Sequence, residues 1–426
     1  MADPKPKMFY GWKVVAGILF ILTFGTGLSF YNHAVILNAL ARQPAFTVQS
    51  ASLAVSLFFL SSGFAGLVVA RWIQAFDVRY CISVGAVISC TALASLALVE
   101  TTWQLYAVYI LFGAGFSASN LIPATTLVTR WFHKQRAVAL SVASTGLSLG
   151  GVVITPVCAI LVETLGLATA GPVMGAMYIV GVVPATWLML RPSPESMGLL
   201  PSGTDEVVAK PVHAAIEAEP VAIRHAFGQG ASLREARSGR FFWGMSLAYI
   251  FLMMAQVGGI SHQYGLAREL LSEAETAMVV AILPLASIIG RLVGGVLVEQ
   301  FSTRAFAMVM MVLQGLSLAL LSAGFGVLSL CVGLALFGVT VGNLLMLQPL
   351  LIAEAFGVKE YARIFSVSNL MTSWGTACGP VLLGIAYAAS QNAYAIPYAF
   401  ASAAGFLGLV LFTAGGKIKR IPDSRV

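Results

Sequence analysis

One cation, Arg291, lies in the middle of a long apolar stretch, LPLASIIGRLVGGVLVE (residues 283–299). Placing a guanidinium at the centre of a membrane-spanning helix costs roughly 2.5–3.5 kcal/mol on insertion-based scales. The group cannot lose its proton to avoid this cost. Its planar fork of donors suits a carboxylate. The stretch therefore predicts that Arg291 faces protein or water and binds an anion, with an internal ion pair as the alternative.

Other polar side chains also fall inside apolar runs and are candidates to line a path through the membrane. No mid-membrane acid is available to pair with Arg291, because Glu299 and Glu354 lie toward the ends of their runs. A buried Asn or Gln often makes only an interhelical hydrogen bond, worth about 0.6 kcal/mol on average. Site lining and helix packing therefore both stay open for these residues. The candidates are Tyr31, Asn32, His33, Asn120, Asn343, Gln348, Asn369 and Trp374.

Histidine is the side chain that titrates nearest to neutral pH, so membrane-embedded histidines are candidates for proton coupling. His33 lies toward one end of the first apolar run, and His262 lies at the end of the seventh. A neutral, hydrogen-bonded histidine is the alternative for both.

The composition excludes a soluble globular class. Of 426 residues, 58% are hydrophobic and 10% are charged, and the mean hydropathy is +0.89, whereas charged residues make up about 25% of soluble domains. The net charge of +7 is spread over short loops, so we expect no nucleic-acid partner.

The sequence contains no Walker loop and no nucleophile–base pair, which indicates a non-enzyme. The cysteines lie in apolar runs without metal-ligand spacing, so we expect neither a metal nor another cofactor; they are Cys81, Cys90, Cys158, Cys331 and Cys378.

Twelve apolar runs are long enough to cross a bilayer, which takes about 20 residues. This pattern predicts an all-α membrane protein with twelve transmembrane helices in two six-helix bundles. The runs are 11–40, 50–74, 79–99, 103–130, 137–163, 167–190, 241–267, 276–298, 305–325, 328–356, 362–389 and 393–414.

The basic residues are distributed asymmetrically between the loops. Nearly all of them fall on one side of the twelve runs, whereas Arg42 and Arg268 fall on the other. The excess of Lys and Arg predicts that both termini and the central loop are cytoplasmic, in a bacterial-type inner (plasma) membrane. Residues 1–190 then form the N-terminal bundle, 191–240 a cytoplasmic linker loop, and 241–426 the C-terminal bundle with a short tail. The linker ends in SLREARSGRFF (residues 232–242), a basic amphipathic run suited to a membrane surface.

The chain also repeats itself at a shift of 225 residues. Gly113 matches Gly338, and Arg79 matches Arg304. Two parallel repeats of six helices are typical of transporters whose halves move around a site near the membrane midplane.

Two loops carry a family resemblance. GRLVGGVLVEQFSTR (residues 290–304) resembles the G-x-x-x-D-R-x-G-R-R signature of the major facilitator superfamily, with Glu299 at the acidic position and Arg304 kept. The first-half copy, ARWIQAFDVR (residues 70–79), has Gln74 in place of the acid and keeps Arg79. The resemblance implies that these loops hold neighbouring helix ends together in one conformation. The implied signature residues are Ala70, Gln74, Arg79, Gly295, Glu299 and Arg304.

A second stretch, WFHKQRAVALSVASTGLSLG (residues 131–150), is similar to the fifth-helix signature of monocarboxylate and oxalate/formate porters, with Lys134 and Arg136 as its basic pair. This resemblance implies that Arg291 is the eighth-helix arginine that binds the substrate carboxylate. Ser287 stands where human-type monocarboxylate porters have an Asp, and Asn369 aligns with a Lys of the oxalate exchangers. One fixed cation suits a monoanion better than a dianion.

The sequence thus predicts a secondary active transporter that moves a small organic monocarboxylate by alternating access, with proton symport or anion exchange. The expected partners are the carboxylate anion, protons and the lipid bilayer; the need for an ancillary subunit stays open. One alternative is an exporter of amphipathic metabolites or drugs. Another, from a different class, is a non-transporting membrane sensor with a transporter fold.

Overall fold

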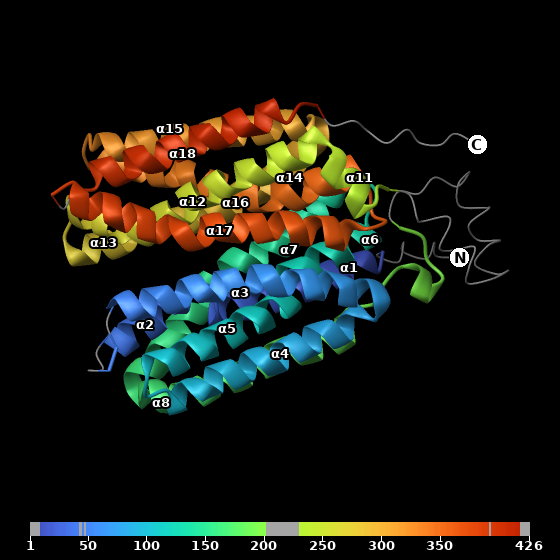
Figure 1. Cartoon of the computed structure of the whole chain (residues 1–426), viewed down its shortest axis with the longest axis horizontal. Helices are drawn as coiled ribbons and strands as arrows, with labels where there is room; N and C mark the ends of the chain where they lie inside the picture. The colour runs from blue at the N-terminus through green and yellow to red at the C-terminus, as the bar shows by residue number, and fades with distance from the viewer. Residues whose placement is uncertain (1–8, 42–44, 47, 202–229, 392, 418–426) are drawn as a thin grey trace, which may run out of the picture.

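The computed structural model describes residues 9–41, 45–46, 48–201, 230–391 and 393–417. These residues form long helices that run side by side (Figure 1). The N-terminal half contains α1 (Gly11–Leu28), α2 (His33–Ala41), α3 (Val48–Ala75), α4 (Val78–Ser95), α5 (Thr102–Ser119), α6 (Leu121–Trp131), α7 (Arg136–Leu149) and α8 (Thr155–Met189). The C-terminal half contains α11 (Leu233–Ser238), α12 (Arg240–Arg268), α13 (Glu273–Val280), α14 (Ile282–Gln300), α15 (Thr303–Ala323), α16 (Val327–Phe356), α17 (Tyr361–Ala389) and α18 (Ala395–Ala414).

The prediction of twelve spans is confirmed. Within the described residues, ten helical stretches are long and apolar enough to cross a membrane. The longest, Arg136–Met189, covers 54 residues and folds as two spans, because Gly166 (φ 73°, ψ 160°) leaves the helical conformation. The 29-residue helix α17 completes the set; its serines, threonines and glycines lower its mean hydropathy.

Three spans are broken where the sequence predicts single runs. The first span is divided into α1 and α2 by residues 29–32, and the fourth is divided into α5 and α6 at Asn120 (φ −115°, ψ −115°). The eighth is divided into α13 and α14 at Ala281. Broken helices in transporters expose backbone groups where they line a cavity. Tyr31, Asn32 and Asn120 all lie at these breaks.

A short π-helix, Gly150–Ile154, joins α7 to α8. The Thr155 amide donates to the Gly150 carbonyl, five residues earlier, in place of the usual four. Single π turns inside α-helices are rare and occur frequently at functional sites.

The internal repeat is present in space as well as in sequence. A Cβ atom added to Gly113 would collide with the carbonyl oxygen of Phe58, and one added to Gly338 would collide with that of Leu283. Both pairs are related by the 225-residue shift. Each half therefore uses the same close approach of two helix backbones, which only small residues allow.

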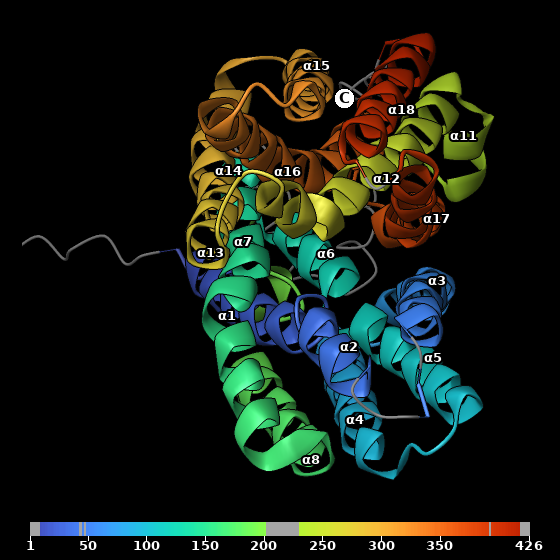
Figure 2. The same ribbon diagram turned by 90° about the vertical axis from the view of Figure 1, so that its left-hand side faces the viewer.

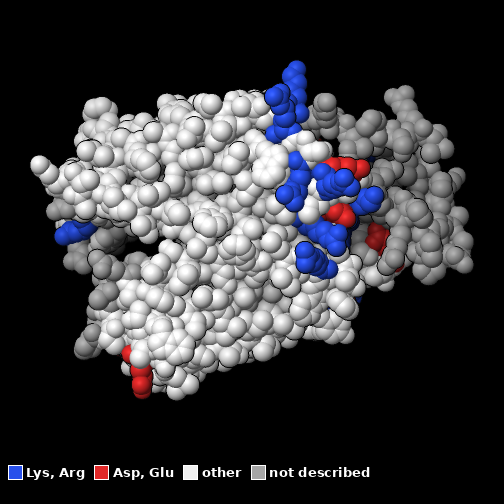
Figure 3. Space-filling view, in the orientation of Figure 1, with Lys and Arg blue, Asp and Glu red and all other residues white. Residues whose placement is uncertain are grey.

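The two halves meet along two seams, α7 against α14 and α3 against α17. Figure 2, which looks along the helices, shows α1–α8 in one group and α12–α18 in the other. The start of α1 at Gly11, the end of α18 at Ala414 and most described Lys and Arg residues lie at one end, here called the basic end (Figures 1 and 3). At the opposite, far end, Figure 3 shows a hollow between the halves.

Candidate functional site

Arg291 is fully buried on α14, at the seam between the two halves. Its Nε donates to the carbonyl oxygen of Gly342 on α16 at 2.9 Å, and its Nη1 donates to the carbonyl oxygen of Ser144 on α7. Nη2 is buried without a hydrogen-bond partner. Within the described ranges, no carboxylate forms an ion pair with the guanidinium. The internal ion pair is therefore not formed in this part of the chain, and one donor of the cation is free for an anion.

Small residues and an amide fix the helix that carries this cation. The side chain of Asn343 on α16 donates through Nδ2 to the Gly290 carbonyl at 2.9 Å and lies directly against Gly294. Gly342 adds to this close fit, because a Cβ there would lie 3.2 Å from Cβ of Arg291. Asn343, one of the predicted lining residues, therefore holds α14 and α16 together beside Arg291.

Tyr31, from the break between α1 and α2, lies close enough to Arg291 to interact with it electrostatically, and its hydroxyl lies beside Ser148. Its ring packs on Gly151, where an added Cβ would lie 2.9 Å from the ring. The Ser148 and Ser287 hydroxyls are 3.3 Å apart across the seam. Tyr31 and Arg291, far apart in sequence, are thus brought together.

The sequence analysis did not identify the serines that surround the cation. Ser141 donates to the Arg291 carbonyl, Ser144 supplies the acceptor for Nη1, and Ser148 faces Ser287. Their spacing of three to four residues places them on one face of α7. That spacing was the available signal, although the sequence analysis used this stretch only for its family resemblance.

Asn120 and Asn32 lie instead among the helices of the N-terminal half. Asn120 donates to the Tyr178 hydroxyl at 2.9 Å, and its Oδ1 is buried without a partner. Asn32 donates to the Leu28 carbonyl and to the Met174 sulfur, each at 3.2 Å. Both contacts join α8 to its neighbours, which is the packing role that the sequence left open.

Three candidates on α16 and α17 are placed differently from one another. Gln348 donates to the Ser368 and Thr372 hydroxyls at 3.0 and 2.9 Å and so joins the two helices. Asn369 follows Ser368 and is half-buried. Trp374 is 49% exposed, on the same face as Val381 and Ile385. That face suits lipid, so the structure does not bring Trp374 to Arg291.

Neither candidate for proton coupling has a carboxylate as a described hydrogen-bond partner. His33 is buried with both ring nitrogens unpaired, and its ring lies 4.4 Å from that of Phe58 and 5.5 Å from that of Tyr109, measured between centroids. His262 lies 3.0 Å from the Pro380 carbonyl through Nε2, which joins α12 to α17 near the far end.

The C-terminal copy of the superfamily signature reaches across the seam at the basic end. Glu299 accepts a hydrogen bond of 3.5 Å from the Val138 amide in the first turn of α7, where the helix dipole favours an anion. Gly295 contacts the side chain of Ser141. Arg304 donates to the Thr413 carbonyl at 3.4 Å, within its own half.

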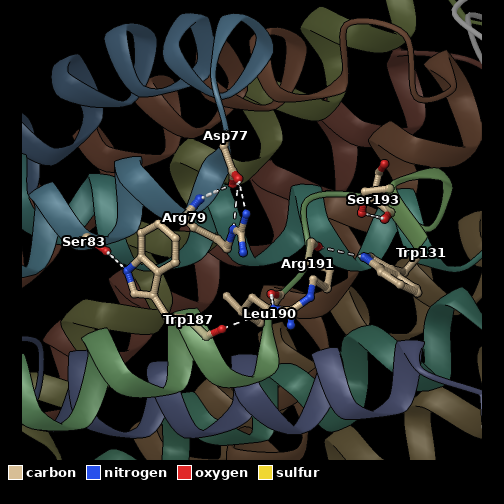
Figure 4. A network of polar contacts seen from close by, with 9 residues as sticks. Asp77, Arg79, Ser83, Trp131, Trp187, Leu190, Arg191 and Ser193 are labelled. Atoms are coloured by element: carbon tan, nitrogen blue, oxygen red, sulfur yellow. Dashed lines mark hydrogen bonds and ion pairs between the residues drawn. The ribbon is translucent and has the colours of Figure 1, made fainter. Parts of the chain in front are cut away.

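The N-terminal copy is arranged differently (Figure 4). Arg79 forms an ion pair of 2.7 Å with Asp77 in the same loop, and its guanidinium lies 4.9 Å from the centre of the Trp187 ring. The sequence analysis did not identify Asp77 as this partner.

Gln74 lines a small pocket at the start of α17 that includes residues of both halves. The other lining residues are Thr126, Thr129, Arg130, Val358, Lys359, Tyr361 and Ala362.

The remaining signature residues lie close to these two copies. Ala70 is fully buried on α3. Lys134 is exposed in the loop between α6 and α7, and Arg136, the first residue of α7, donates to the Phe132 carbonyl at 2.9 Å. This basic loop therefore precedes the helix end that Glu299 contacts.

Two helix bundles related by an internal repeat, with a buried cation at their seam, define the architecture of a membrane transporter. The model of the Major Facilitator Superfamily matches residues 19–267 and 257–424. The chain therefore belongs to the major facilitator superfamily, which confirms the broader of the two resemblances.

Similar proteins support this assignment. The MFS transporter asaE of Aspergillus flavus is 26% identical over 343 residues, covering 80% of this chain and 70% of that protein. The MFS-type transporter pynF of Aspergillus niger is 27% identical over 193 residues, 43% of each chain. The uncharacterized MFS-type transporter YcxA of Bacillus subtilis is 22% identical over 185 residues, covering 43% of this chain and 44% of that protein.

Solved structures show the same fold. The proton:xylose symporter XylE superposes with a TM-score of 0.74 at 13% identity, covering 96% of this chain and 98% of that one. The fucose:proton symporter FucP of E. coli gives a TM-score of 0.66 at 13% identity, covering 95% and 98%. At these identities the likeness establishes the fold, not the substrate.

Proposed function

We propose that this protein moves a small organic monocarboxylate across the membrane by alternating access, and that Arg291 binds the carboxylate. The observation that carries this proposal is the buried guanidinium at the seam, with Nη2 unpaired and without an ion pair among the described carboxylates. A carboxylate accepts two parallel hydrogen bonds from one guanidinium edge. A neutral solute would leave the buried charge without a counter-charge.

The same cation couples the substrate to the contact between the halves. Nη1 now donates to the Ser144 carbonyl of the opposite half. A carboxylate bound across Nη1 and Nη2 would compete with this contact. Substrate binding would then weaken the α7–α14 seam, and the seam would weaken substrate binding by the same factor.

Polar groups around the cation would set the shape of the site. Tyr31, Ser148 and Ser287 surround it directly, and Asn343 positions its helix. We propose that four further groups line the substrate path in another arrangement of the two halves: Asn32, Asn120, Gln348 and Asn369. We propose His33 and His262 as the groups that couple transport to protons. Proton symport and anion exchange both remain compatible with this arrangement.

The orientation follows from the charges. We propose that the basic end is cytoplasmic, because Lys and Arg accumulate on that side of membranes, and that the host membrane is a bacterial-type inner membrane. The hollow at the far end (Figure 3) then faces outward. Single cysteines introduced at the exposed positions Lys134 and Arg268 test this orientation. A membrane-impermeant maleimide added to intact cells should label the cysteine at position 268 and not the one at position 134.

Transport in proteoliposomes tests the function. We expect labelled lactate or pyruvate to enter when an inward proton gradient is imposed, or when the vesicles are preloaded with the anion, which separates symport from exchange. Arg291→Ala should lower uptake at least about 30-fold, since removing one partner of a buried charge pair costs roughly 2–5 kcal/mol.

Arg291→Lys is the matched control, because it keeps the charge and loses the planar fork. We expect it to retain weak uptake with a raised KM. Uptake that survives Arg291→Ala would contradict the proposal. Entry of xylose but no acid in either mode would contradict the substrate class.

A further inference from the structure

A surface groove of about 340 Å³ lies at the basic end, where α11 and the start of α12 meet the end of α18. Its lining combines two kinds of side chain. Arg237, Arg240 and Trp243 contribute polar groups, and Leu247 and Leu411 contribute apolar surface. Lys and Arg side chains gather over this end of the molecule, where α11 lies (Figures 1 and 3).

The groove exists because two glycines let the backbones of α12 and α18 come together. A Cβ added to Gly244 would lie 2.8 Å from the Gly415 nitrogen and 3.0 Å from the Leu411 carbonyl oxygen. A larger residue at Gly244 would force the two helices apart. The floor of the groove is therefore a built feature of the fold.

Arg237, on the rim of the groove, is held in place by Trp243. Trp243 Nε1 donates to the Arg237 carbonyl at 2.7 Å, and the Arg237 guanidinium lies 5.9 Å from the centre of the Trp243 ring. The Leu233 amide donates to Glu360 at 2.8 Å, which ties α11 to the start of α17. The segment SLREARSGRFF is thus docked on the protein.

The acid on α11 does not neutralise this rim. Glu235 accepts hydrogen bonds from the Ser232 amide at 2.7 Å and the Ser232 hydroxyl at 2.8 Å, which closes the N-terminal turn of α11. Arg237 and Arg240 are both exposed. The groove therefore presents two exposed cations beside the apolar side chains of its lining.

We propose that this groove binds an anionic phospholipid, with the head-group phosphate on Arg237 and Arg240 and an acyl chain along Leu247 and Leu411. Arginines bind phosphate oxygens through charge-assisted hydrogen bonds. Tryptophan, here 39% exposed at Trp243, is typical of the depth at which head groups lie. Basic pockets between membrane helices select anionic head groups. The site lies outside the seam that holds Arg291 and does not depend on the transported substrate.

Native mass spectrometry of the full chain in detergent tests this proposal. The protein is titrated with phosphatidylglycerol and, separately, with phosphatidylcholine of the same acyl chains. We expect the wild-type protein to retain phosphatidylglycerol preferentially. The double variant Arg237→Gln/Arg240→Gln should bind it about 30-fold more weakly, because each basic residue near an anionic surface contributes about 1 kcal/mol.

Two controls make the result specific. Arg237→Lys/Arg240→Lys keeps the charge and should retain most of the preference, and Arg268→Gln, at the far end of α12, should bind like the wild type. Equal retention of both lipids by the wild-type protein would overturn the proposal. So would phosphatidylglycerol binding that the double glutamine variant leaves unchanged while its thermal unfolding matches that of the wild type.

Discussion

The same loop occurs twice at the basic end, and its two copies meet the opposite half in different ways. Glu299 reaches from α14 to the first turn of α7 in the opposite half. The residue 225 positions earlier, Gln74, lies beside the start of α17 in the opposite half, at the matching place but without charge. The acid of that copy, Asp77, is used within its own loop, where it pairs with Arg79.

This difference shows that a duplicated fold distributes its charges unequally between its seams. The α7–α14 seam contains the anionic contact of Glu299 as well as Arg291, whereas at the basic end of the α3–α17 seam Gln74 is neutral. Substrate binding at Arg291 would therefore act on the seam that already depends on charge. At the other seam, Gln74 lies beside the cations Arg130 and Lys359 and supplies no charge to attract them.

The largest effect should come from Gly295, which contacts Ser141 across the charged seam. Gly295→Leu inserts a side chain where there is no room, and overpacking of this kind costs about 1–3 kcal/mol. We expect the basic end to open, with spin-label distances between α7 and α14 lengthened in most molecules. Ala70→Leu, at the matching position of the N-terminal half, compares the two copies directly. Unchanged distances in the Gly295 variant would show that the seam is not closed at this point.

Glu299→Gln should make the two copies alike. Loss of an anion at a helix N-terminus costs about 0.3–1 kcal/mol, and up to about 2 in partly buried sites, so we expect a two- to tenfold rise in the fraction of molecules open at the basic end. Double electron–electron resonance between labels on α7 and α14 measures this fraction. If the variant and wild-type distributions coincide, the contact does not hold the seam.

Asp77→Asn should lower the stability of the N-terminal copy without opening a seam. Asparagine caps a helix about as well as aspartate, so the variant keeps the cap that Asp77 forms by accepting from the Arg79 amide at 2.9 Å. It loses the ion pair with Arg79 at 2.7 Å, and partly exposed pairs of this kind contribute about 0.2–1 kcal/mol. Burial opposes ionisation of Asp77, but the hydrogen bonds and charge of Arg79 outweigh it and hold its pKa below 3.8. The stabilisation is therefore present above pH 3.8 and is lost as the pH falls through the folded-state pKa.

Thermal unfolding between pH 3 and 7 measures this contribution. The wild-type and Asp77→Asn proteins should differ near pH 7 and converge at the acid end. Ser302→Ala is the matched control, since Ser302 caps α15 at the equivalent position and has no titrating group. Convergence of that variant as well would remove Asp77 as the cause.

Gln74→Glu should give the smallest effect, in the opposite direction. A carboxylate there would face the start of α17, beside Arg130 and Lys359. We expect a gain of a few tenths of a kcal/mol for the closed basic end, and about a twofold slower turnover in proteoliposomes. Faster turnover would mean that the α3–α17 seam does not limit the motion.

Much of the architecture could be predicted from the sequence. The length of the apolar runs identified the spans, the 225-residue shift identified the repeat, and the isolated charge of Arg291 indicated a side chain that faces protein or water and not lipid. These signals are local or periodic. The sequence divided the fifth and sixth runs at residues 163–167, and Gly166 is where the helix breaks.

The partners of individual side chains could not be predicted in the same way. In a membrane, both lipid-facing and protein-facing surfaces are apolar, so periodicity did not show that Trp374 lies on an exposed face. Asn120 and Asn343 are alike in sequence context, yet one packs on Tyr178 and the other beside Arg291. The Ser141 and Ser144 contacts depend on how two helices lie against each other, which no single stretch encodes.

The π turn at Gly150–Ile154 has a consequence for how the fifth span rotates. One extra residue in a turn offsets the following side chains by about 100° around the helix axis, relative to an uninterrupted α-helix. The serine face of α7 and the part of the span beyond Ile154 are therefore out of phase by one residue. If this turn were to shorten to an α turn, the part of the span beyond Ile154 would rotate about the helix axis. The serines of α7 would keep their contacts with Arg291.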